Sequence, residues 1–176
     1  MAAMSDAKKA SEAELVRQMA VKLRQDIGVL ERFRNSGVPK NFLDFCHIRA
    51  HHNNIQGLVF VIQDKMAPVL DLLPDNMSDW IVTAKMKALS LFVEISRGFV
   101  GDPPLTLTGS LTARDVLSNE QKNFSEAHDF FNKILMEQAL DDRTADRLVN
   151  TLTLIEETIA IIEQLLSKSV NYLDEF

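Results

Sequence analysis

Apolar residues recur at intervals of three and four along most of this 176-residue chain, and strict alternation of apolar and polar residues is rare. Such spacing places apolar side chains on one side of an α-helix, whereas alternation is typical of a strand. The pattern therefore predicts an all-α fold. We expect a helical bundle of about five principal helices, arranged up and down, with one longer loop and a long C-terminal helix.

Capping residues, glycines and prolines mark the ends of the expected helices. Gly37 can supply a left-handed exit from the first helix, and Pro39 suits the first turn of the next. Asp141 and Asp142 suit a helix start, both as caps and as negative charges at the positive end of the dipole. The expected elements are a helix from near Ser11 to about Asn35, a second from Pro39 to about Met66, a short turn at Val69–Leu73, a third helix from Ser78 to about Arg97, a loop over 98–111, a fourth helix from Thr112 or Ser118 to near Leu140, and a fifth from Asp141 or Asp142 to Leu173.

Chain length and cysteine content bear on domain number and compartment. With 46% apolar residues, a chain of this size can bury a core without disulfides or a structural metal. We expect a flexible segment over 1–10 and a single helical-bundle domain over 11–176. Cys46 is the only cysteine, so no disulfide forms within the chain, and a cytoplasmic location is expected. The densest apolar stretch, Leu58–Ile62, is too short to span a membrane.

The charge balance constrains the kind of partner. The chain has 19 basic and 25 acidic residues, a net charge of −6, and residues 101–176 carry 14 acidic against 6 basic side chains. An acidic surface repels nucleic acid and anionic lipid. We therefore expect neither nucleic acid nor a membrane as partner, and instead a protein, which for the acidic part would present a basic face.

A polar cluster interrupts the second expected helix between two apolar blocks. It contains His47, His51 and His52 and the amide of Asn54. On a helix His47 and His51 share a side because they are four residues apart, whereas His52 lies in line with apolar Ile55. We expect these side chains to be interior polar groups that fix helix register.

Three other interpretations of this cluster stay open. His47 and His51 could chelate a metal ion, with His128 of the fourth helix as a third ligand. An exposed histidine could exchange a phosphoryl group with an aspartate of a response regulator. The cluster could also line a polar pocket for a small ligand. No cofactor is expected, because no phosphate-binding, dinucleotide-binding or zinc-protease motif occurs in the sequence.

The last helix has a seam typical of coiled-coil packing, which favours self-association. We therefore predict a non-enzymatic protein-protein interaction module, an adaptor, chaperone-like or regulatory bundle that forms a homodimer. The alternative is a histidine-site protein, either a metal enzyme or a phosphotransfer protein, that uses the cluster from His47 to Asn54. The candidate interaction residues are Leu152, Ile155, Ile159, Ile162 and Leu166.

Overall fold

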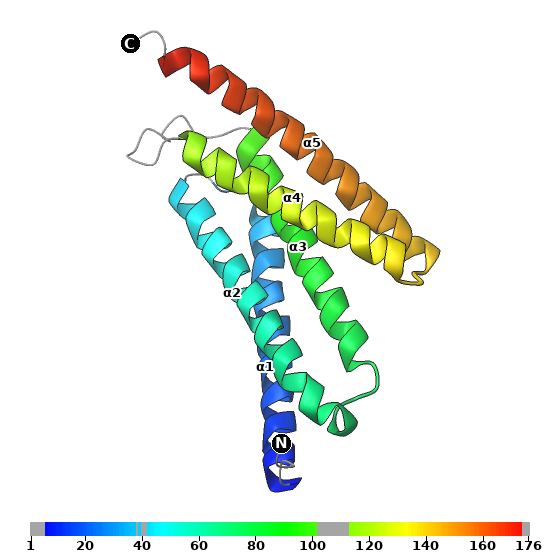
Figure 1. Cartoon of the computed structure of the whole chain (residues 1–176). Helices are drawn as coiled ribbons and strands as arrows, with labels where there is room; N and C mark the ends of the chain where they lie inside the picture. The colour runs from blue at the N-terminus through cyan, green and yellow to red at the C-terminus, as the bar shows by residue number, and fades with distance from the viewer. Residues whose placement is uncertain (1–5, 38, 40–41, 102–112, 174–176) are drawn as a thin grey trace. The chain divides into compact units, whose positions relative to one another are not determined.

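The computed structural model describes residues 6–37, 39, 42–101 and 113–173, and this part of the chain is helical without any strand. The predicted all-α fold with five principal helices is confirmed (Figure 1). The elements are α1 (Asp6–Ser36), α2 (Phe42–Met66), the 3₁₀ helix η1 (Ala67–Leu72), α3 (Met77–Gly101), α4 (Ala113–Glu137) and α5 (Asp142–Leu173).

The chain divides into two compact units. The first contains α1, the part of α2 from His47 onwards, η1 and the part of α3 up to Leu91. The second contains the first turn of α2, the part of α3 from Phe92 onwards, α4 and α5. The single domain expected over 11–176 stays a prediction.

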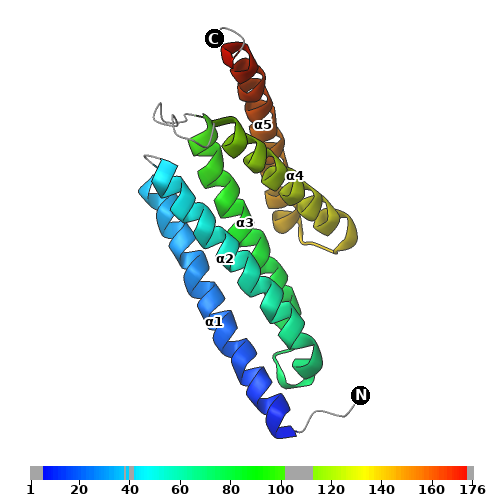
Figure 2. The same ribbon diagram turned by 60° about the vertical axis from the view of Figure 1, so that its left-hand side comes forward.

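In the first unit, α1, α2 and α3 lie side by side (Figure 2). Each helix contributes apolar residues at intervals of three and four, so that a continuous core forms between them. Two polar contacts join α1 to α3 at the edge of this core: Lys87 pairs with Glu31 at 2.6 Å, and the Arg24 guanidinium lies over the Trp80 ring at 5.5 Å. The buried core residues of this unit include Val16, Leu23, Ile27, Leu30, Ile48, Ile55, Val59, Ile62, Ile81, Ala84 and Ala88.

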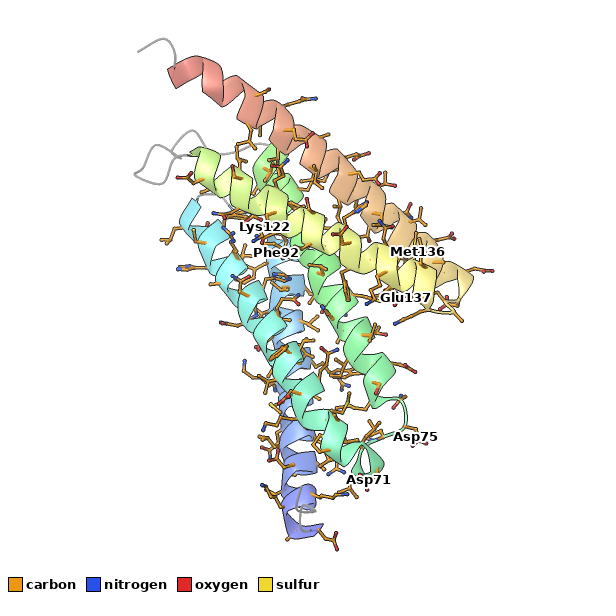
Figure 3. All side chains as sticks on the ribbon, in the orientation of Figure 1. Asp71, Asp75, Phe92, Lys122, Met136 and Glu137 are labelled. Carbon is orange, nitrogen blue, oxygen red and sulfur yellow. The ribbon has the colours of Figure 1, made fainter. Side chains whose placement is uncertain are left out.

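The short segment η1 packs against α1. Arg17 donates a hydrogen bond of 2.6 Å to the carbonyl oxygen of Leu72, and Lys9 lies 3.8 Å from the Asp71 carboxylate. Val69 is buried, whereas Pro68 and Pro74 are exposed. The segment Val69–Leu73, expected to be one helical turn or a packed connection, combines both: it belongs to a 3₁₀ helix as far as Leu72, but Val69 has a non-helical backbone with φ of −130°. Figure 3 labels Asp71 in η1 and Asp75 in the turn that leads to α3.

In the second unit, α4 and α5 form an antiparallel helical hairpin (Figures 1 and 2). Both helices bury one apolar side, and polar pairs cross its edge: Gln121 donates to Glu163 at 3.2 Å, and Arg97 of α3 pairs with Glu157 at 2.6 Å. The buried residues of the hairpin include Phe124, Ala127, Phe131, Ile134, Leu148, Leu152, Ile155 and Ile162.

Several predicted helix ends are wrong by a few residues. Helix α1 begins at Asp6 and not near Ser11, so residues 6–10 add a turn and a half with an acidic first residue. Pro39 lies outside α2, which begins at Phe42. Gly37 has φ of +103°, so the predicted left-handed exit from the first helix is confirmed.

The ends of α3 and α4 also differ from the prediction. The amide of Trp80 donates to the carbonyl oxygen of Asn76, so the helix starts one residue before Ser78. The predicted end near Arg97 is wrong, because α3 continues to Gly101 and buries Phe99 and Val100. Of the loop expected over 98–111, residues 98–101 are therefore helical, and the rest lies outside the described residues. Helix α4 starts at Ala113, close to the weaker of its two predicted starts, and ends three residues before Leu140.

The predicted start of the last helix is confirmed. The Asp141 carboxylate accepts a hydrogen bond of 3.0 Å from the Thr144 amide and one of 2.6 Å from the Thr144 hydroxyl. This is the geometry of an N-cap. Both bonds stabilise the ionised carboxylate and lower the pKa of Asp141.

Candidate functional site on helix α2

His52 is buried on the core side of α2, as its place in the apolar line predicts. Only 6% of the residue is exposed. The Gln56 amide nitrogen lies 3.0 Å from Nε2 of His52, and because an amide nitrogen can only donate, the imidazole nitrogen accepts. His52 is therefore neutral, with its proton on Nδ1.

Burial also fixes the charge of His52. Desolvation, with a smaller contribution from the neighbouring His51, lowers the pKa of His52 to about 4. The ring therefore stays uncharged at neutral pH and is closed off from a docking aspartate. These properties are those of an interior polar group.

His51 connects α2 to α1. Its Nε2 lies 3.0 Å from the main-chain oxygen of Asp26, to which it donates a hydrogen bond. The Asp26 carboxylate is itself held by Lys22, whose Nζ lies 2.5 and 2.7 Å from the two carboxylate oxygens. The half-buried His51 thus bridges two packed helices.

The remaining two histidines have other surroundings. His47 is exposed on α2. His128 belongs to the second unit, where its Nε2 lies 3.1 Å from a Glu156 oxygen on α5 and Asn132 approaches the same ring at 3.2 Å. Among the described residues, no three His, Cys, Asp or Glu side chains are grouped so as to hold a metal ion.

The seam of α5 is enclosed within its own unit. Leu152, Ile155 and Ile162 are buried, and Ile159 and Leu166 are half-buried. Helix α4 runs antiparallel to α5 and supplies the opposing apolar side. The buried residues of this seam are therefore covered by packing within the second unit, and the use of the seam for self-association stays a prediction.

The outward side of α2 has a different character. No Asp, Glu, Lys or Arg occurs from Ala50 to Gln63, although a quarter of the chain is charged. Five exposed residues on this part of the helix form what we call the α2 face: Asn53, Asn54, Gly57, Phe60 and Val61.

Two of these residues are large apolar side chains in contact with water. Phe60 is 72% exposed and Val61 is 41% exposed. Between the asparagines and Phe60 lies Gly57, where an added Cβ would meet no atom within 4 Å. The centre of the α2 face is thus free of side-chain atoms, with an exposed aromatic ring one turn further along.

Sequence motifs do not mark this face, because they consist of groups that carry chemistry. The signal that marks it is the absence of formal charge over four turns of an amphipathic helix, together with knowledge of which side is buried. The spacing of the apolar residues places Ile48, Ile55 and Val59 on the core side of α2. Gly57 and Phe60 therefore lie on the opposite, outer side.

No protein-family model, curated protein or solved structure matches this chain. None of the helices in the described ranges combines the length and the apolar character needed to cross a membrane. The functional interpretation therefore depends on the side chains of α2 and their surroundings.

Proposed function

We propose that this chain is a non-enzymatic protein-interaction module that binds its partner through the α2 face. The observation that carries the proposal is the exposure of Phe60 in a stretch of α2, residues 50–63, that carries no formal charge. Aromatic residues are enriched at the centres of protein interfaces, and charged residues are depleted there.

Comparison with the exposed residues of α5 supports this choice. They include Glu156, Glu157 and Glu163, which pair with His128, Arg97 and Gln121 of neighbouring helices. The exposed residues of the α2 face are instead asparagine, glycine, phenylalanine and valine. Covering the α2 face lowers the free energy, because water is removed from the Phe60 ring and no charged side chain of residues 50–63 loses its hydration.

The partner that fits this face is an α-helix with an apolar, uncharged side. A charged partner surface would lose hydration against the α2 face without finding an opposite charge. The acid excess of residues 101–176 lies outside the face, so the basic partner expected from composition is not part of the proposal. A cytoplasmic location is included in the proposal, and the single cysteine is compatible with it.

Photo-cross-linking in cells of the native host tests the proposal. We would replace Phe60 with p-benzoylphenylalanine and, as a matched control, Met136 of α4, which is 85% exposed (Figure 3). We expect a discrete cross-linked product from position 60, with the captured peptide on an uncharged apolar helix, and none from position 136. Equal yields at both positions, or no product at position 60, would contradict the proposal.

A further inference from the structure

The α2 face is complementary to itself in one orientation, and we infer that its partner is a second copy of this chain. This inference rests on the proposed function and identifies the partner of the same face. It follows from the order of residues along α2 and from the charge of the chain.

The complementarity concerns Phe60 and Gly57. When two copies of α2 pack antiparallel about a twofold axis between Leu58 and Val59, Phe60 of each copy faces Gly57 of the other. The ring then covers the position where the glycine lacks a side chain and where nothing lies within 4 Å of an added Cβ. Both contacts form at once, because the twofold axis makes them equivalent.

The same register pairs polar groups at the ends of the contact. Asn53, Gly57, Phe60 and Asp64 follow one another in steps of four, three and four, so they lie along one line of the helix. In the antiparallel pair Asn53 faces Asp64 of the second copy, so that an amide can donate to a carboxylate. The two Asp64 side chains are then about 16 Å apart along the axis, beyond the Debye length of about 10 Å at 0.1 M salt.

Charge favours the α2 face over the exposed glutamates of α5 as the site of contact between two copies. Two copies that each carry a net charge of −6 repel one another, and contact through the glutamates of α5 would add to that repulsion. In a contact through the α2 face, the nearest like charges are the two Asp64 side chains, about 16 Å apart along the axis. The electrostatic repulsion against this contact therefore comes mainly from the net charge of the whole chain.

Gly57 provides an independent reason. Glycine in the middle of an exposed helix destabilises that helix relative to alanine. The structure has room for a Cβ at this position, so packing within the chain does not require glycine. Close approach of another helix does require it, since even a methyl group would separate Phe60 from the backbone it covers.

The contact is small, a few turns of one helix on each side. Interfaces of this size are at the low end for specific complexes, so we expect a weak dimer with a Kd in the micromolar range. The mass of the purified full chain, measured by light scattering, should rise from monomer to dimer between about 1 and about 500 µM. A wild-type chain that stays monomeric over this range would overturn the inference.

Two aspartate variants test the face. Phe60→Asp places a charge beside the twofold axis and should leave the chain monomeric throughout the concentration range. Met136→Asp introduces the same charge at an exposed apolar position of α4 and should dimerise like the wild type. Circular dichroism confirms that both variants are folded. A dimeric Phe60→Asp variant, or loss of the dimer in the control, would overturn the assignment to α2.

Disulfide trapping tests the orientation. In a Cys46→Ser background, chains with Asn53→Cys are mixed with chains with Asp64→Cys and oxidised. Antiparallel pairing predicts disulfide-linked dimers in the mixture and few when either chain is oxidised alone. Cross-linking of Asn53→Cys with itself would indicate parallel pairing and overturn the proposed register.

Failure of this inference can be distinguished from failure of the proposed function. A monomeric chain that still cross-links from position 60 to another protein in cells would overturn self-pairing and leave the interaction module intact. Absence of both the dimer and the cellular cross-link would overturn both proposals.

Discussion

Phe45 and Phe99 stack face to face, with ring centroids 4.3 Å apart and ring planes inclined by only 4°. The contact joins the first turns of α2 to the last turns of α3 within the second unit, and Val116 of α4 completes the buried cluster. Phe92 also stacks with Phe45, with ring centroids 6.5 Å apart and ring planes inclined by 22°. Burial of Phe99 provides the physical reason why α3 continues past Gly98.

Truncation of this stack should destabilise the chain strongly. We expect Phe99→Ala to lower the free energy of unfolding by about 3–5 kcal/mol, because a buried aromatic ring is lost and a cavity remains. Urea unfolding followed by circular dichroism measures the change. As a control, Met136→Ala at an exposed position should stay within about 0.5 kcal/mol of the wild type. Similar effects of the two variants would contradict the burial of Phe99.

The stability of the chain should fall as the pH is lowered past the ordinary pKa of histidine. The pKa of His52 is about 4 in the folded chain and near 6.5 when unfolded, so the unfolded state takes up the proton first. The resulting loss begins near pH 6.5, is complete near pH 4, and is on the order of 3 kcal/mol.

Variants isolate this effect from the titration of carboxylates. Urea midpoints between pH 7 and pH 4 should fall less steeply for His52→Gln than for the wild type. His47→Gln removes an exposed histidine from the same helix and should retain the wild-type slope. If His52→Gln had an unchanged slope, His52 would not be the buried neutral group described above.

The cap of α5 can be tested with two variants of Asp141, one that removes both side-chain oxygens and one that keeps one of them. Asp141→Ala removes both hydrogen bonds to Thr144 and should lower the thermal midpoint and the helix signal of circular dichroism. Asp141→Asn keeps an oxygen that can accept from the Thr144 amide, so most of the stability should remain. Equal losses in both variants would indicate that charge at the helix start, and not capping, is the main contribution.

Gly57→Ala should change folding and association in opposite directions. The monomer gains helix propensity, and we expect the free energy of unfolding to rise by about 0.5–1 kcal/mol. Unfolding at submicromolar concentration measures this gain without the dimer. The same variant should dimerise less well than the wild type in light scattering. A variant that is more stable and also dimerises normally would show that the Phe60 ring does not lie over Gly57.

The sequence was sufficient for the parts of the fold that depend on local patterns. The steps of three and four residues identify five principal helices, Asp141 is recognisable as a cap, and His52 falls on the core side of α2 by its register alone. The left-handed turn at Gly37 likewise follows from residue type.

Features that depend on contacts between residues far apart in the chain could not be predicted from local sequence patterns. The length of α3 follows from Phe99 meeting Phe45, a contact between residues far apart in the chain. The apolar seam around Ile155 indicates that α5 packs against another helix. The spacing of the seam is the same whether that helix is α4 of the same chain or a helix of a second chain. The α2 face emerges only when the buried side of α2 has been covered by its neighbours.

The two adjacent histidines of α2 hold this helix by different bonds. His51 donates to the Asp26 carbonyl and so ties α2 to α1. His52 accepts from Gln56, and a proton on that nitrogen abolishes the bond. Acid therefore acts on α2 from its interior side, because protonation of His52 both removes a hydrogen bond and places a charge in the core of the first unit.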